Sequence, residues 1–172
     1  MHVWKMSVAL IFVQCCVFAE SASLVGTYTW CESEREKQVI AQAVEAGVAQ
    51  IGCLLRSIAR SRLTTSTKPF KTLTFTEVSG GCMQMVRDAD NPIVTPTNGV
   101  AVAWTRNDGK VFQVQQFWAG TALIQIYSDE DMNVRENAYT LAPDGTTLTI
   151  AVTIKSTRFK TPIRYALNYL RH

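Results

Sequence analysis

Residues 24–38, LVGTYTWCESEREKQ, decide the fold, because a strand and a helix meet within them. Residues 24–30 alternate in polarity and are rich in threonine and aromatic side chains, which favours a β-strand. Residues 33–36 have the S-x-x-E form of a capping box. In that motif the serine hydroxyl accepts from the amide three residues on, and the glutamate reaches back to the serine amide. The stretch therefore predicts a strand that runs straight into a capped helix.

One long helix is predicted over residues 33–62. Its apolar residues recur at spacings of three and four and form one stripe: Ile40, Val44, Val48, Ile51, Leu55 and Ile58. Gly47 and Gly52 each weaken the helix by about 1 kcal/mol relative to alanine, so a kink or a split is expected there. We expect the stripe to pack on the core, with a membrane or a partner helix as the alternative.

Beyond residue 70 the helical spacing gives way to strand-like segments joined by turns. Turn sequences stand at residues 79–81, 106–110, 128–133 and 142–145. About eight strands therefore follow the helix in sequence-local hairpins, and a meander of eight or nine strands can close into a barrel that leaves no edge exposed. The predicted fold is mainly β: an antiparallel up-and-down barrel of about eight to nine strands, with one long helix after the first strand.

Residues 1–21 are predicted to be a signal peptide. A short basic start precedes the apolar run at residues 6–19, and an A-x-S cleavage site follows. A membrane anchor is the alternative, but spanning a bilayer takes about 20 apolar residues. A lipoprotein would need a small residue where Gln14 stands. We therefore expect a secreted or periplasmic protein with no stable membrane anchor and one domain, residues 22–172.

The net charge of +3 is too mild to indicate a nucleic-acid partner, and the basic residues are scattered rather than clustered. The predicted mature chain keeps Cys31, Cys53 and Cys82. With residues 33–62 in one helix, Cys31 and Cys53 would lie about 33 Å apart, whereas a disulfide needs Cα atoms within about 7 Å. No intrachain disulfide is expected. Because export favours pairing, a bridge from Cys82 to Cys31 or Cys53 stays open.

One strand, a helical segment and an antiparallel meander together resemble the calycin superfamily, especially the fatty-acid-binding proteins, in which helices follow the first strand. Gly26, Thr27 and Tyr28 are similar to the G-x-W signature of lipocalins and the G-T-W start of fatty-acid-binding proteins. In those families a basic residue near the end of the last strand packs across that aromatic ring. The resemblance implies that Gly26, Tyr28, Trp30 and Arg171 close the barrel, although Tyr28 stands where the families have tryptophan.

Enzyme chemistry is not predicted, and neither is a cofactor or a metal. Histidine occurs only at positions 2 and 172, so a Ser-His-Asp triad or a histidine metal site has no interior histidine. Glu77 and Glu136 are the only acids within predicted strands, and each is expected to face water or a basic neighbour rather than form a catalytic pair. The acidic segment at residues 128–133 lacks the glycine and the distal glutamate of a calcium loop, so a solvated turn is expected.

Aromatic side chains on the strands indicate the candidate site. A barrel of this size either fills with side chains or holds one small apolar ligand. Arg135 is the residue chosen to meet a ligand carboxylate, since a buried charge needs a partner. The candidate ligand-binding residues are Trp104, Phe117, Tyr127, Arg135, Tyr139 and Tyr165.

The sequence therefore predicts a secreted or periplasmic binding protein that carries a small hydrophobic ligand in a barrel. The alternative is a filled-core interaction module of the inhibitor or adhesin type that acts through its loops without a ligand. The oligomeric state stays open.

Overall fold

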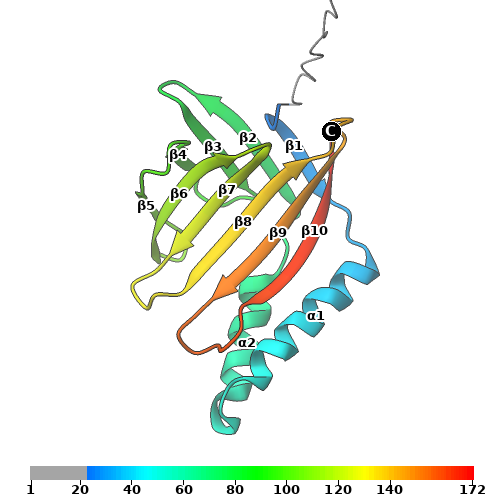
Figure 1. The fold of residues 1–172 in the computed structure, drawn as a ribbon, viewed down its shortest axis with the longest axis vertical. Coiled ribbons are helices and arrows are strands. Elements are labelled where there is room, and N and C mark those ends of the chain that lie inside the picture. Colours follow the sequence, from blue (N-terminus) through cyan, green and yellow to red (C-terminus); the bar gives the residue numbers. More distant parts are fainter. Residues whose placement is uncertain (1–22) are drawn as a thin grey trace, which may run out of the picture.

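The structure is a computed structural model that describes residues 23–172, and the predicted signal peptide lies outside the described residues. Strand β1 (Gly26–Trp30) forms where predicted and leads into a helical hairpin, after which the chain runs through successive antiparallel hairpins. The strands of this described part form one ten-stranded sheet, curled into a nearly closed barrel with the helices at one end (Figure 1). The predicted antiparallel barrel is confirmed.

After β1 the strands are β2 (Thr72–Val78), β3 (Cys82–Arg87), β4 (Ile93–Pro96), β5 (Val102–Thr105), β6 (Val111–Ala119), β7 (Ala122–Ser128), β8 (Val134–Leu141), β9 (Thr147–Lys155) and β10 (Ile163–Arg171). Neighbours in sequence are neighbours in the sheet except for β4 and β5, and β1 also pairs with β10, so that the first strand joins the last. Strands β4 and β5 are the two ends of the sheet.

The structure has ten strands where eight to nine were predicted, and β4 is the strand that the sequence pattern missed. It is only four residues long, begins directly after Pro92 and ends with Pro96. Proline cannot donate a ladder hydrogen bond and is confined to strand ends and sheet edges. The edge position of β4 makes both prolines compatible with a strand.

The expected single helix is wrong, because the chain breaks it into α1 (Glu34–Ala49) and α2 (Arg56–Thr67), joined by the 3₁₀ turn η1 (Cys53–Leu55). The break falls beside Gly52, whose ψ of 142° is not helical. Gly52 is one of the two predicted weak points, and the other, Gly47, stays inside α1.

The break also divides the predicted apolar stripe. Its first half, Ile40, Val44 and Val48, is buried as expected. Leu55 and Ile58 are 54% and 55% exposed, because α2 starts afresh after the turn and no longer continues the face of α1.

A buried carboxylate, that of Glu36, fixes the junction between strand and helix. The Ser33 hydroxyl accepts from the Glu36 amide at 3.2 Å, as the capping box predicts. The Glu36 side chain does not reach back to Ser33. Its carboxylate instead accepts from the Trp30 indole at 2.9 Å and from the backbone and side-chain amides of Asn168 at 2.6 and 3.0 Å. One side chain thus ties α1 to both β1 and β10.

Arg171 closes the barrel end opposite the helices. Tyr28 and Arg171 stand opposite each other in the β1–β10 ladder, and the guanidinium carbon lies 5.7 Å from the centre of the Tyr28 ring. The guanidinium also donates to the Val25 carbonyl. Gly26 has a φ of 150°, which other residues rarely adopt, and a Cβ there would also come within 2.9 Å of the Arg171 Nε. Trp30, which was also predicted to help close the barrel, donates to Glu36 at the helix junction.

Removing residues 171 and 172 is expected to lower the melting temperature by about 5 °C, because the cation–π contact and the guanidinium hydrogen bonds are lost together. Thermal unfolding followed by circular dichroism measures the change. Arg164→Ala is the control, since Arg164 is exposed on the same strand. Identical melting curves for the truncated and full-length chains would contradict this closing role.

Candidate functional site

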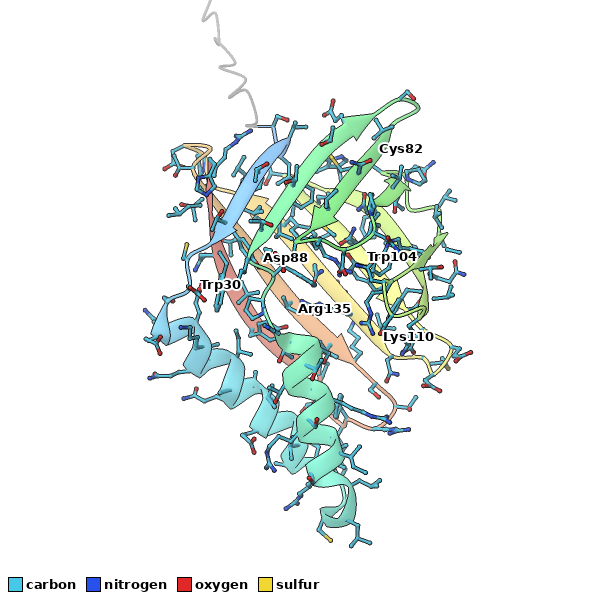
Figure 2. All side chains as sticks on the ribbon, turned by 180° about the vertical axis from the view of Figure 1, so that it is seen from behind. Trp30, Cys82, Asp88, Trp104, Lys110 and Arg135 are labelled. Atoms are coloured by element: carbon cyan, nitrogen blue, oxygen red, sulfur yellow. The ribbon has the colours of Figure 1, made fainter. Side chains whose placement is uncertain are left out.

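A cavity of about 1020 Å³ opens between α2 and the barrel end that faces it. The turns that follow β3, β5, β7 and β9 form its rim, and the adjoining strand ends form its walls. Figure 2 looks onto α2 and shows Arg135 beside the end of that helix, with Trp104 and Lys110 further across the barrel.

Aromatic rings form much of the cavity wall. Trp104 on β5, Phe112 on β6 and Tyr127 on β7 lie with ring centres 6.0 to 6.5 Å apart. The Trp104 indole donates to the Asn91 carbonyl at 3.2 Å, which fixes the ring. Phe70 and Ile154 extend the apolar lining. The arrangement offers flat apolar surface to a small molecule.

Arg87, at the end of β3, places a buried cation on this wall. The residue is only 7% exposed, and its guanidinium carbon lies 4.5 Å from the ring centre of Phe70, 4.8 Å from that of Trp104 and 5.4 Å from that of Tyr127. Asp90 accepts from one terminal nitrogen at 3.1 Å. The Nε atom has no hydrogen-bond partner within residues 23–172. The site therefore holds an under-satisfied positive charge.

Sequence reasoning missed Arg87, although the alternation of β3 points to it. Met83 and Met85 face the core, and residue 87 follows them at the same spacing of two. An arginine in an inward position is an expensive exception that signals a site.

Arg135, the predicted carboxylate-binding residue, also lines the cavity. Its Nε donates to the Asn137 side chain at 3.0 Å, and its Nη1 donates to the Ser66 carbonyl near the end of α2 at 2.7 Å. Arg135 thus connects the inner wall of the barrel to the helix that covers the cavity.

Ion pairs join the turns on the rim. Lys110 donates to Asp129 at 2.7 Å, and the Asn133 amide donates to the same carboxylate at 2.9 Å. Burial raises the pKa of Asp129, but the hydrogen bonds from Lys110 and Asn133 outweigh it and leave the pKa below its usual value. A hydrogen bond from Arg106 lowers the pKa of Asp108 to about 2. The acidic segment at residues 128–133 is the hairpin turn between β7 and β8. The described residues contain no cluster of acids, cysteines and histidines that could hold a metal ion.

The structure brings together half of the six predicted ligand-binding residues. Trp104, Tyr127 and Arg135 line the cavity. Tyr139 and Tyr165 are buried deeper in the barrel, 2% and 6% exposed.

Phe117 is the exception and lies on the outer face of β6. Val114 and Gln116 face inward and are fully buried, so residue 117 points the other way. The sequence hypothesis counted Phe117 by its place on a strand and did not follow the alternation of that strand.

Below the cavity the barrel is filled. The Tyr127 hydroxyl donates to the Gln125 Oε1, and the Tyr139 hydroxyl donates to the same oxygen at 3.0 Å. Burial raises the pKa of Tyr127, Tyr139 and Tyr165, so these phenols stay protonated as donors. Phe75 packs edge-on against Tyr139. The barrel thus combines a side-chain-filled half with an open half.

The remaining sequence candidates lie away from the cavity. Glu77 is exposed, and Glu136 lies 3.6 Å from Lys155, a basic neighbour of the expected kind. Cys31, Cys53 and Cys82 are unpaired within the described chain, and the expectation of no intrachain disulfide stays a prediction. Across residues 23–172, no helix combines the length and the apolar character that crossing a membrane requires.

The chain forms a nearly closed antiparallel barrel, with a helical hairpin after the first strand and the first strand paired to the last. Solved structures of fatty-acid-binding proteins match most of the chain in fold. The predicted resemblance is confirmed at the level of fold.

Three similar structures illustrate the match. Fatty-acid-binding protein 1 of Echinococcus granulosus has a TM-score of 0.53 and 12% identity, covering 86% of this chain and 96% of its own. The Schistosoma mansoni fatty-acid-binding protein in complex with arachidonic acid has a TM-score of 0.50 and 17% identity, covering 88% and 98%. The fluorescent protein UnaG has a TM-score of 0.52 and 12% identity, covering 87% and 96%. No protein-family model and no curated protein sequence matches the chain.

Proposed function

We propose that this chain is an exported binding protein, secreted or periplasmic, that carries a small hydrophobic molecule in the cavity beneath α2. The cavity is the observation that carries the proposal, since about 1020 Å³ with an aromatic wall and a few placed polar groups suits a small-molecule ligand. Similar structures named as fatty-acid-binding proteins, one of them solved with arachidonic acid, support the same class of ligand. The predicted signal peptide supports export.

The carried molecule has an acidic group. Arg87 and Arg135 line one cavity, and Arg87 is buried with a single carboxylate partner. Charge-assisted hydrogen bonds from a guanidinium to a carboxylate are among the strongest in proteins. An anionic ligand would pair with the Arg87 guanidinium alongside Asp90.

The protein is proposed to be a carrier rather than an enzyme. The titratable groups that line the cavity are arginines, lysines, aspartates and the Tyr127 phenol, whose pKa is raised by burial. A general base is most often a histidine, and no histidine is among the described residues that line the cavity. The filled half of the barrel agrees with the interaction-module alternative, but that alternative gives the cavity no role.

Isothermal titration calorimetry with oleic acid and oleyl alcohol tests the proposal, because the two ligands differ only in the head group. The wild type is expected to bind both and to prefer the acid. Arg87→Gln is expected to weaken the binding of oleic acid by about tenfold to a hundredfold, which corresponds to the loss of one charged hydrogen bond. The affinity for oleyl alcohol is expected to stay unchanged. Arg164→Gln, on the exposed face of β10, is the control.

The outcomes separate the two functions. Binding of neither ligand, together with no small molecule retained in native mass spectrometry, would favour the interaction module. If Arg87→Gln weakened the binding of the acid and of the alcohol equally, Arg87 would shape the cavity wall without contacting the head group. N-terminal sequencing after expression of the whole chain tests export, with cleavage expected after residue 21.

A further inference from the structure

The cavity is lined by more positive than negative charge, and the surplus lies on one side of it. Seven cations and five carboxylates line the cavity, which leaves a surplus of two positive charges. All five carboxylates belong to the turns that follow β3, β5 and β7, where three ion pairs form: Arg87–Asp90, Arg106–Asp108 and Lys110–Asp129. The other four cations are here named the cationic cluster: Arg62, Lys68, Arg135 and Arg158.

The cationic cluster is assembled from α2, β8 and the turn between β9 and β10. Arg62 and Ser66 are four residues apart on α2 and therefore share the helix face that lines the cavity. The Arg135 Nη1 donates to the Ser66 carbonyl at 2.7 Å, so Arg135 reaches the same part of α2. Arg135 stands opposite Ile154 in the β8–β9 ladder, and Arg158 follows in the turn directly after β9. The cations thus line the part of the mouth next to α2.

No carboxylate of the described chain pairs with the cationic cluster. Within residues 23–172, none of its four members takes part in an ion pair. Neither α2 nor the β9–β10 turn at residues 156–162 contains an aspartate or a glutamate. Like charges that gather at one place repel each other, and an anion that binds between them relieves the repulsion. The cluster therefore favours a ligand with more than one negative charge.

A phosphate monoester suits the cationic cluster better than a carboxylate does. A carboxylate carries one negative charge on two oxygens, whereas a phosphate monoester at neutral pH carries about 1.5 to 2 charges on three oxygens. Guanidinium groups bind phosphate through paired hydrogen bonds, and three of the four cations are arginines. The hydrogen bonds of Arg135 to Asn137 and Ser66 use two of its five N–H groups, so the others can donate to a ligand.

We propose that the molecule carried in the cavity is a lipid phosphate monoester, with its phosphate on the cationic cluster and its apolar chain along the aromatic wall. This inference rests on the proposed carrier function and names the head group of the ligand. A head-group charge of about −2 matches the surplus of two positive charges around the cavity. Ile58 and Ala59 line the cavity from the same helix as Arg62, so an apolar chain finds apolar surface next to the cluster.

Oleyl phosphate and oleic acid test the inference in calorimetric titrations, because they share one chain and differ in the head group. Methyl oleyl phosphate is the third ligand, since its methyl ester leaves a single negative charge on the head group. The wild type is expected to bind oleyl phosphate about tenfold tighter than either of the others, which corresponds to one added charge-assisted hydrogen bond. Inorganic phosphate at the same concentration is expected not to displace oleyl phosphate, because it lacks the apolar chain.

Arg158→Gln tests the cationic cluster itself. It is expected to weaken the binding of oleyl phosphate by about tenfold, since one charged hydrogen bond is lost, and to leave the binding of oleic acid unchanged. Lys160→Gln is the matched control, because it removes the same charge from the same exposed turn, and Lys160 does not line the cavity. Both ligands are expected to keep their wild-type affinity in this control.

The outcomes separate the head group from the carrier function. Equal binding of the three oleyl ligands by the wild type would overturn the inference and leave the carrier function intact. Equally tight binding of oleyl phosphate and its methyl ester would show that the second charge is not recognised, and displacement by inorganic phosphate would show a site for the free ion; either result rejects the lipid phosphate monoester. Equal weakening in Arg158→Gln and Lys160→Gln would reject the assignment to the cluster. Binding of none of the ligands would overturn the carrier function and the inference together.

Discussion

Replacing Glu36 with alanine is expected to lower the free energy of unfolding by about 3–5 kcal/mol, the range for breaking a buried, charge-assisted hydrogen-bond network. The Glu36 carboxylate accepts from the Trp30 indole and from two amide groups of Asn168, and the residue is 7% exposed. Alanine would leave those donors without a partner. It would also loosen α1 from the strands that close the barrel.

Urea unfolding followed by circular dichroism measures the loss, with the midpoint and the slope fitted separately. Glu34→Ala is the matched control, because Glu34 lies in the same first turn of α1 and pairs only with Lys37 at the surface. Exposed pairs of this kind contribute about 0–1 kcal/mol. Equal destabilisation by the two substitutions would contradict the role of Glu36 as a tie between helix and strands.

The local pattern of the sequence predicted the elements that local physics controls. The alternation in residues 24–30 and the S-x-x-E motif placed the first strand and the start of the helix. Gly52 was recognised as a weak point, but a spacing rule could not tell a kink from a complete break. The capping motif gave the Ser33 hydrogen bond, while the partners of Glu36 lie on other strands and follow only from closure of the barrel.

The candidate site was harder to predict, because it is assembled from strands that are distant in the sequence. Arg87 on β3 and Tyr127 on β7 meet only when the sheet curls, and no local motif encodes that contact. Trp104 and Arg135, selected as aromatic or charged side chains on strands, line the cavity, and their role in ligand binding stays a prediction. Phe117 shows the limit of that criterion, since its strand position alone does not say which face it occupies.

Replacing Phe75 with alanine is expected to cost about 3–5 kcal/mol of unfolding free energy, as for other large-to-small changes in a packed core. Phe75 is 1% exposed, and its ring centre lies 6.1 Å from that of Tyr28 and 5.1 Å from that of Tyr139, edge to face in both pairs. It therefore fills the half of the barrel away from the helices. A void there cannot collapse, because the surrounding strands are held by their ladders.

The same substitution tests whether the two halves of the barrel act separately. Phe75 does not line the cavity, so the folded fraction of Phe75→Ala is expected to bind oleic acid within about threefold of the wild type, as for a residue that makes no ligand contact. Phe159→Ala is the converse control, since Phe159 lines the cavity and is only half-buried, and it should weaken binding more than it lowers stability. Loss of binding in folded Phe75→Ala would mean that the ligand extends through the filled half, and the division of the barrel into a packed core and an open site would be wrong.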